Sequence, residues 1–265
     1  MNEKEYRSHP AISRSELWRI RESPEKFKYY REHPPEPTPA LVFGQLFHKM
    51  ALQPEGVFEE FACLPNINRR TKDGKSAYAE WLNASEGKAV ITADMWDNAV
   101  EMCAALQAND YCRKLLSGAK ETPYFWVDEM TNEQCKCRTD CTVEINGMPL
   151  VVDLKSTNDA SNDAFMRDAV RYGYDFQAAM YLEGVKAVTG IEHGFVFIAV
   201  EKTEPYSINI FQCDKPFIQH GYDIFRELLG IYHDCKQTGN WFGYLGRYNA
   251  VNTLSLPSYL AKAVE

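Results

Sequence analysis

The amino-acid sequence predicts an α/β domain with a helical elaboration at its N-terminus. Three observations lead to this class. Helix-type spacing of apolar residues dominates residues 13–52, strand-type alternation replaces it over residues 122–155, and helices then mix with two apolar strands as far as residue 235. No internal repeat, low-complexity tract or sharp change of composition interrupts this order, so we expect a single domain across residues 1–265.

The N-terminal helices are predicted from their start signals. Ser13 followed by Glu16 forms a capping box, which predicts a helix from residue 13 to about residue 30. Four prolines within residues 33–39 exclude regular structure there, because each proline removes a backbone donor and restrains its predecessor. Beyond them we expect a helix at 40–52, a basic turn-rich loop at 68–75 with a helix to residue 84, a strand at 89–91, and a helix from Thr92 to about residue 107.

A three-stranded meander is predicted in the middle of the chain. Residues 124–128, 134–143 and 149–155 alternate like strands, and Asn146-Gly147 fits a tight hairpin turn between the second strand and the third. These two strands are therefore expected to be adjacent and antiparallel. After the meander we expect helices at 163–172 and 175–188, strands at 194–200 and 206–212, and a helix at 215–235.

Composition limits the class of protein. The 265 residues are 45% apolar and 13% aromatic, which is ample for a packed core. No apolar run approaches the roughly 18 residues that span a bilayer, and the polar start lacks a secretory signal, so we expect a soluble, cytoplasmic protein without membrane contact. A net charge of −8 argues against indiscriminate nucleic-acid binding but allows a local basic surface.

The eight cysteines are expected to be reduced. They are scattered along a chain without an export signal, and only Cys135, Cys137 and Cys141 lie close together. This trio lacks a fourth nearby ligand for zinc or an iron–sulfur cluster. Strand alternation places all three on one face, so we interpret them as buried packing residues.

Two charged residues interrupt the most apolar strand of the meander. In Leu150-Val-Val-Asp-Leu-Lys-Ser156, Asp153 and Lys155 share one face of a strand, about 7 Å apart. Such a pair can be a solvated surface ion pair, but burial among apolar residues is costly unless the charges are paired or bind a metal. A carboxylate can hold a divalent cation while an ammonium handles the attacking water or the phosphate charge. Asp140 on the preceding strand completes a D…DxK pattern typical of metal-dependent phosphodiester nucleases.

Two helical pairs are further candidates. Gly44 and His48 stand one turn apart, and the glycine would permit the close approach of a strand. Gln177 and Tyr181 repeat this spacing on a later helix. Each pair alone is more often structural than functional. In chain order, however, Gly-x3-His, Asp, Asp-x-Lys and Gln-x3-Tyr form one joint pattern.

This joint pattern resembles the RecB-type branch of the PD-(D/E)xK nuclease superfamily, and within it the RecE (exonuclease VIII) family in its free-standing phage or prophage form. The resemblance implies a central mixed sheet with flanking helices, a helical part at residues 1–60 that carries the Gly-x3-His motif, and a catalytic core at residues 120–235. The segments that carry the resemblance, besides these motifs, are Ala11-Ile-Ser-Arg-Ser15, Asn68-Arg-Arg-Thr71 with Gly74-Lys75, Cys137-Arg-Thr-Asp140, Asp153-Leu-Lys-Ser-Thr157 and Thr253-Leu-Ser-Leu-Pro257.

The resemblance also implies roles for single residues. Asp140, Asp153 and the carbonyl of Leu154 would bind Mg²⁺, and Lys155 would orient or activate water and stabilise the developing charge. His48 would lie at the metal site, where Mn²⁺ could substitute, and Gln177 would position the lysine or a phosphate. Glu121 is a further candidate acid. The candidate DNA contacts are Arg14, Ser15, Arg69, Arg70, Lys72, Lys75 and Tyr181.

The activity that the resemblance implies is processive 5′→3′ digestion of one strand of linear duplex DNA. The expected product is a 3′ overhang, and the expected partners are double-stranded DNA ends, a strand-annealing protein of RecT type and further copies of the chain in a toroidal tetramer. Three alternatives stay open at this point. The chain could belong to an iron–sulfur branch of these nucleases, be a restriction-type endonuclease, or be a DNA-end-binding module that has lost catalysis.

Overall fold

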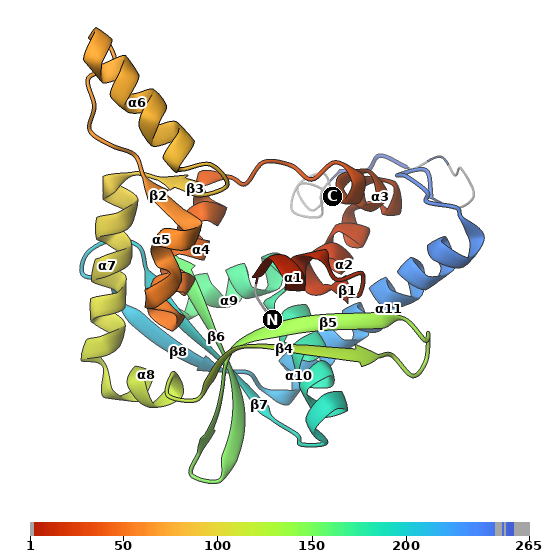
Figure 1. Ribbon diagram of the computed structural model, residues 1–265. Coiled ribbons are helices and arrows are strands. Elements are labelled where there is room, and N and C mark those ends of the chain that lie inside the picture. The colour runs from red at the N-terminus through yellow and green to blue at the C-terminus, as the bar shows by residue number, and fades with distance from the viewer. Residues whose placement is uncertain (1–2, 247–250, 252, 257–265) are drawn as a thin grey trace.

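The computed structural model describes residues 3–246, 251 and 253–256, and its centre is a mixed sheet (Figure 1). The sheet has six strands in the order β1-β5-β6-β7-β8, with β4 paired to β5. Its strands are β1 (Ile12–Ser13), β4 (Ala119–Val127), β5 (Gln134–Ile145), β6 (Met148–Thr157), β7 (Gly194–Glu201) and β8 (Ile208–Gln212). Helices flank this sheet, which confirms the predicted fold class.

The predicted meander is present. Strands β4, β5 and β6 pair antiparallel in chain order, and β6 then pairs parallel with β7. Asn146 and Gly147 form the turn between β5 and β6 with φ values of 51° and 76°, as expected for a tight hairpin turn. This turn fixes the register in which β5 and β6 face each other.

The sheet divides the apolar interior into two clusters, one on each face. Alternate residues of β7 enter different clusters: Phe195 and Phe197 pack with α10 and α11, whereas Val196 and Ile198 pack with α4 and α7. The helices are α1 (Glu3–Ser8), α2 (Arg14–Glu22), α3 (Pro24–Glu32), α4 (Pro39–Leu52), α5 (Val57–Glu60) after a 3-10 turn (Pro54–Gly56), α6 (Lys72–Ala84), α7 (Ala93–Ala108), α8 (Asp110–Leu115), α9 (Asn162–Arg171), α10 (Tyr174–Thr189) and α11 (Lys215–Thr238).

The single helix predicted from residue 13 to residue 30 is wrong. Two helices, α2 and α3, meet at Ser23, which has an extended backbone with φ −174° and ψ 131°. Pro24 cannot donate to an earlier carbonyl, so the first helix ends before it and the proline becomes the first residue of the second. The hydroxyl of Ser23 accepts the Lys26 N–H at 3.4 Å and caps α3.

Several short elements lie outside the prediction. A parallel pair of strands, β2 (Phe61–Cys63) and β3 (Ala89–Ile91), brackets α6, and of these only β3 was expected. The helices α1, α5 and α8 and the two-residue strand β1 were also missed. Each is too short for a periodic pattern to emerge, which is the physical reason for the omission. Strand β4 begins five residues earlier than predicted, at Ala119.

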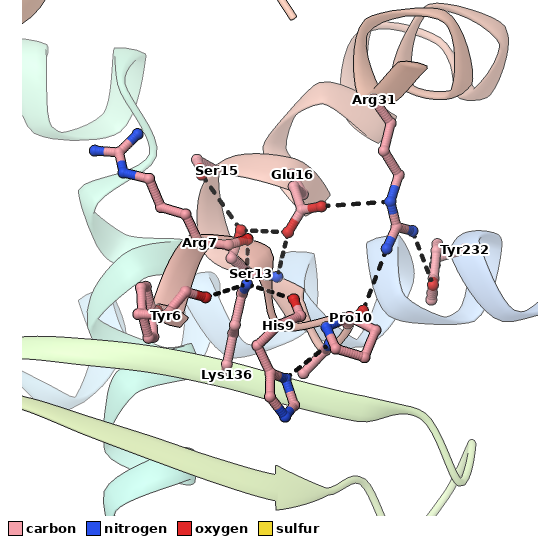
Figure 2. Close-up of polar contacts among 11 residues, drawn as sticks. Tyr6, Arg7, His9, Pro10, Ser13, Ser15, Glu16, Arg31, Lys136 and Tyr232 are labelled. Carbon is pink, nitrogen blue, oxygen red and sulfur yellow. Dashed lines mark hydrogen bonds and ion pairs between the residues drawn. The ribbon is translucent and has the colours of Figure 1, made fainter. Parts of the chain in front are cut away.

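Lys136 links helix α1 to the sheet through hydrogen bonds. Its side chain lies on β5 with 3% exposure. Figure 2 shows its ammonium donating to the backbone carbonyls of Tyr6 at 2.8 Å, Arg7 at 3.3 Å and His9 at 2.7 Å. These contacts lie where α1 ends, among the carbonyls that the last turn of a helix leaves without partners in the next turn.

Helix α6 stands away from the body of the molecule (Figure 1). Gly74 is its only buried residue. The turn before it is locked, because the Thr71 hydroxyl accepts the Gly74 N–H at 3.0 Å and an added Cβ at Gly74 would overlap the Asn68 carbonyl. A projecting arm with a rigid tip results, and we call residues 68–84 the arm.

The buried cysteines agree with the sequence interpretation except in one respect. Cys135, Cys137 and Cys141 are all buried as free thiols. The three divide between the two clusters, since Cys141 packs apart from the other two. The expectation that all three line one face of the sheet is therefore wrong, although all three are packing residues as predicted. As for membranes, within the part of the chain that the structure describes, no helix is both long and apolar enough to cross a bilayer.

Candidate active site

Strands β5 and β6 bring the predicted carboxylates together. The ladder pairs Cys141 with Val152, and one step further along it Asp140 and Asp153 lie on neighbouring strands. Lys155 follows Asp153 on the same face, and its Nζ contacts the Asp153 carboxylate. The exposure of Asp153 is only 2%, so the solvated surface pair considered from the sequence is ruled out.

Asp140 is held by the next strand and by a helix. Its Oδ2 accepts the backbone N–H of Leu154 at 2.7 Å and lies 3.3 Å from Nδ1 of His48. His48 comes from α4, which reaches the site from the side of the second apolar cluster. We expected glycine at residue 44 to permit the close approach of a strand. This expectation is wrong, because an added Cβ there would lie 3.9 Å from Ser156 Oγ, which is an ordinary contact.

Asp153, Lys155 and Gln177 form a closed triangle. Lys155 Nζ pairs with Oδ1 of Asp153 and donates to Oε1 of Gln177 at 3.0 Å. Gln177 Nε2 in turn donates to Oδ2 of Asp153. Gln177 belongs to α10, so this triangle joins the helix to β6. The arrangement places Gln177 in contact with the lysine, and its role in positioning the lysine or a phosphate stays a prediction.

Burial and neighbouring charges shift the pKa values in this cluster. Burial raises the pKa of Asp153, and the Asp140 carboxylate adds to that shift. Burial also opposes ionisation of Asp140, but His48, Lys155 and the Leu154 N–H together bring its pKa below the usual range. For His48 burial works against the charge, yet the Asp140 carboxylate raises its pKa above 6.5. The two carboxylates and the imidazole thus influence one another's protonation.

The donor set suits a divalent cation. Two carboxylates, the Leu154 carbonyl and an imidazole are ligands that Mg²⁺ or Mn²⁺ accept. Asp153 Oδ1 is buried and makes no hydrogen bond, although Lys155 contacts it as an ion pair, so this oxygen has unused coordination capacity. Among the described residues, no three His, Cys, Asp or Glu side chains are already gathered as a metal cluster, so Asp140, Asp153 and His48 would have to close further around an ion.

Arg14 and Ser15 begin helix α2, next to the start of α10. Arg14 donates to the backbone carbonyl of Gly173 at 2.8 Å and also to that of Tyr172, while its Nε is buried without a hydrogen bond. Ser15 is exposed, and its hydroxyl lies 3.4 Å from that of Ser13. The capping interaction is present, since Glu16 Oε2 accepts both the N–H and the hydroxyl of Ser13 (Figure 2).

The other candidate residues fall in three places. Tyr181 lies one turn beyond Gln177 on α10, and burial, followed by the charges of Tyr6 and Asp153, raises the pKa of its phenol. Glu121 Oε2 lies 2.8 Å from Arg138 Nε, so this carboxylate forms an ion pair within the protein. The four cations of the basic loop, Arg69, Arg70, Lys72 and Lys75, are exposed on the arm and form no ion pair with any described residue.

Two aromatic residues of the site were missed from the sequence. Lys155 Nζ lies 4.7 Å from the ring centroid of Tyr174 and 5.6 Å from that of Phe197. Tyr174 stands three residues before Gln177, so helical spacing could have placed both on one side of α10. Nothing in the strand pattern distinguishes Phe197 from an ordinary core residue.

A mixed sheet that carries Asp140 and Asp-x-Lys on adjacent strands is the arrangement of a PDDEXK-like domain. The chain belongs to the family described as PDDEXK-like domain of unknown function (DUF3799), whose model matches residues 13–253. No curated protein matches the sequence.

A solved structure shares the fold. A candidate exonuclease from Eubacterium rectale covers 99% of this chain and 98% of its own length, with a TM-score of 0.66 and 19% sequence identity. A phage-related exonuclease from Haemophilus somnus 129PT is 15% identical and covers 64% of this chain and 85% of its own. Its TM-score is 0.36.

Proposed function

We propose that this protein is a Mg²⁺-dependent exodeoxyribonuclease that digests one strand of linear double-stranded DNA from its 5′ end. The observation that carries this proposal is the cluster of Asp140, Asp153 and Lys155 on two adjacent strands, in which Asp153 is buried and the other two are half-buried, in a chain of the PDDEXK-like family. Exonuclease activity is also the one named for the E. rectale protein of the same fold. The metal, the 5′→3′ polarity and the 3′ overhang follow from the resemblance to the RecE family.

The side chains divide the work of hydrolysis. Asp140 and Asp153, with the Leu154 carbonyl and His48, would hold the cation, for which Mn²⁺ could substitute. When bound, such a cation lowers the pKa of water and neutralises phosphate charge. Lys155 would face the scissile phosphate and stabilise its developing negative charge. Gln177 would keep Lys155 in place through the 3.0 Å hydrogen bond. No covalent intermediate on the protein is required.

DNA would be held by two further groups of residues. The exposed cations of the arm, Arg69, Arg70, Lys72 and Lys75, suit contacts with backbone phosphates, because none of them forms an ion pair with a residue that the structure describes. Arg14 and Ser15 at the capped start of α2, and Tyr181 on α10, would contact the strand that enters the site. On a chain of net charge −8, a local basic arm would favour productive binding over general adhesion.

In the cell we propose a role in recombination by strand annealing. The 3′ overhang would be passed to an annealing protein of RecT type, in the cytoplasm. A toroidal tetramer that encloses the duplex would explain processive digestion. These partners rest on the family resemblance, and sedimentation of the purified chain with and without linear DNA would test the tetramer.

The function is tested first by digestion of linear duplex DNA in Mg²⁺, with a label at the 5′ or the 3′ end of one strand. Early release of the 5′-terminal nucleotide, with a covalently closed circle left intact, is the expected result. Cleavage of the circle would instead indicate an endonuclease. Binding to DNA ends without any metal-dependent cleavage would indicate a binding module that has lost catalysis.

Neutralising the arm should weaken DNA binding at low salt and flatten its salt dependence. If Arg69 and Arg70 each contact one phosphate, the R69A/R70A variant should lose about two units of slope in a plot of log K against log salt. Fluorescence anisotropy of a labelled duplex measures this slope. The control is K28A/K114A, which removes two exposed lysines from α3 and α8. An unchanged slope in R69A/R70A would argue against phosphate contacts by the arm.

The metal requirement should depend on pH. His48 and Asp153 both have raised pKa values, and both must be deprotonated to bind a cation. The Mg²⁺ concentration for half-maximal cleavage should therefore rise as the pH falls toward and through the raised pKa of His48, which lies above 6.5. Titrations of Mg²⁺ at several pH values measure this effect. A constant midpoint between pH 6 and 8.5 would contradict it.

A further inference from the structure

The ammonium group of Lys155 rests on two aromatic rings. Its Nζ lies 4.7 Å from the centroid of Tyr174 and 5.6 Å from that of Phe197, and the two rings are 5.5 Å apart at an angle of 32°. The Lys155 side chain is only 15% exposed. A cation on a ring face is attracted to the π-electrons, and the attraction grows when water is excluded.

Tyr174 is held in place by the backbone around it. It is the first residue of α10 and follows Gly173, which has φ 67°. A Cβ at Gly173 would overlap the ring of Trp18, and the Gly173 carbonyl accepts Arg14 at 2.8 Å. The start of the helix is thus fixed from two sides, and the Tyr174 ring with it.

Tyr174 contacts the Lys155 ammonium through its ring face rather than through its hydroxyl group. The structure gives the hydroxyl no hydrogen bond to any of the described residues. Burial raises the pKa of the phenol, so the ring stays neutral. Phenylalanine at this position would therefore present the same surface to Lys155.

One partner of Lys155, the Asp153 carboxylate, also has a second proposed partner. Asp153 contacts both Lys155 and Gln177, yet it is also a proposed metal ligand. A bound metal cation would partly neutralise the Asp153 carboxylate, which would then attract the Lys155 ammonium less strongly. Lys155 would then depend on Gln177 and on the rings. Tyr174 and Gln177 stand three residues apart on α10, so a single helix supplies both supports.

We propose that Tyr174 is a positioning residue, whose ring face holds the Lys155 ammonium at the reacting phosphate when Asp153 serves as a metal ligand. This inference rests on the proposed function. It adds a residue outside the Gln-x3-Tyr motif, and it assigns that residue an electrostatic task rather than simple packing.

Three substitutions at residue 174 separate the electrostatic task from packing. Y174F keeps the ring and its charge distribution. Pentafluorophenylalanine at this position keeps a ring of nearly the same shape but reverses its charge distribution, and Y174L removes the ring. The matched control is Y172L, because Tyr172 is 46% exposed, lies 6.0 Å from the Tyr174 ring and makes no ring contact with Lys155.

Two measurements are needed on these variants. The first is kcat and KM for linear duplex DNA. We expect Y174F and Y172L to lie within about twofold of the wild type, and the pentafluorophenylalanine and Y174L variants to lose about tenfold in kcat with little change in KM. The second is the NMR shift of the Lys155 ε-CH₂ protons in metal-free protein. Ring currents from Tyr174 and Phe197 should move these protons upfield. Every variant that keeps a ring at residue 174 should retain this shift, and Y174L should lose the part of it that comes from Tyr174.

The outcomes distinguish this inference from the proposed function. Equal kcat values for Y174F and the pentafluorophenylalanine variant, with cleavage by the wild type intact, would overturn the positioning role alone. An unshifted Lys155 signal in the wild type would overturn the contact itself. A wild type that never cleaves DNA would overturn the proposed function and, with it, the catalytic part of this inference, whereas the NMR shift would still test the contact.

Discussion

Replacing Lys155 with alanine should reduce the rate of DNA cleavage roughly a thousandfold while the chain stays folded. The ammonium is the only cation in the triangle with Asp153 and Gln177, so no neighbour within that triangle can replace its charge. The fold should survive because the Asp153 carboxyl, whose pKa is already raised by burial, can take up a proton. Single-turnover cleavage and circular dichroism measure the two effects.

The control for this variant is K120A. Lys120 is an exposed lysine on β4, and its loss should leave cleavage unchanged. D153A should be as inactive as K155A, but it should in addition lose Mg²⁺ affinity, which calorimetry can measure. Near-normal cleavage by folded K155A would refute the role given to the lysine.

Adding one methyl group at Gly221 should destabilise the protein by about 3 kcal/mol. Gly221 lies on α11 where that helix crosses α10, and a Cβ there would overlap the backbone carbonyl of Asp175. Backbone cannot move aside as a flexible side chain can, so the two helices would have to separate. We expect G221A to melt several degrees below the wild type in a thermal scan.

The same helix provides the matched control. Gly230 also lies on α11, but a Cβ added there would have no described atom within 4 Å apart from its chain neighbours and the adjacent backbone of its own helix. Because alanine is the better helix former, G230A should stabilise the protein by about 0.5–1 kcal/mol. If both variants shift the melting temperature in the same direction, the close crossing of α10 and α11 is not what requires glycine at residue 221.

The strands around the site were predictable because their signals are local. Alternation identified β5 and β6, and Asn146-Gly147 fixed the turn between them, so the neighbouring positions of Asp140 and Asp153 followed from the sequence. The break at Ser23 was missed because the apolar spacing continues across it. Only the proline at residue 24 signalled that α2 ends there.

The contacts that complete the site depend on tertiary structure. The position of Tyr174 on its helix could be read from spacing, but that Lys155 lies against its ring could not. Nor could the sequence indicate that Glu121 forms an ion pair with Arg138. The DNA contacts expected from Arg14, Ser15, Tyr181 and the arm stay predictions, since they concern a partner rather than the fold.

The contact between Lys136 and the end of α1 has a practical consequence for protein engineering. A short helix at a chain end is usually the first segment trimmed to improve a crystallisation target. Here the loss of residues 3–9 would strip the Lys136 ammonium, which is 3% exposed, of three carbonyl partners. Such a truncation would remove three hydrogen-bond partners from a buried charge on β5, the strand that also carries Asp140. A shortened chain should therefore also replace Lys136 with an apolar residue of similar length, such as methionine.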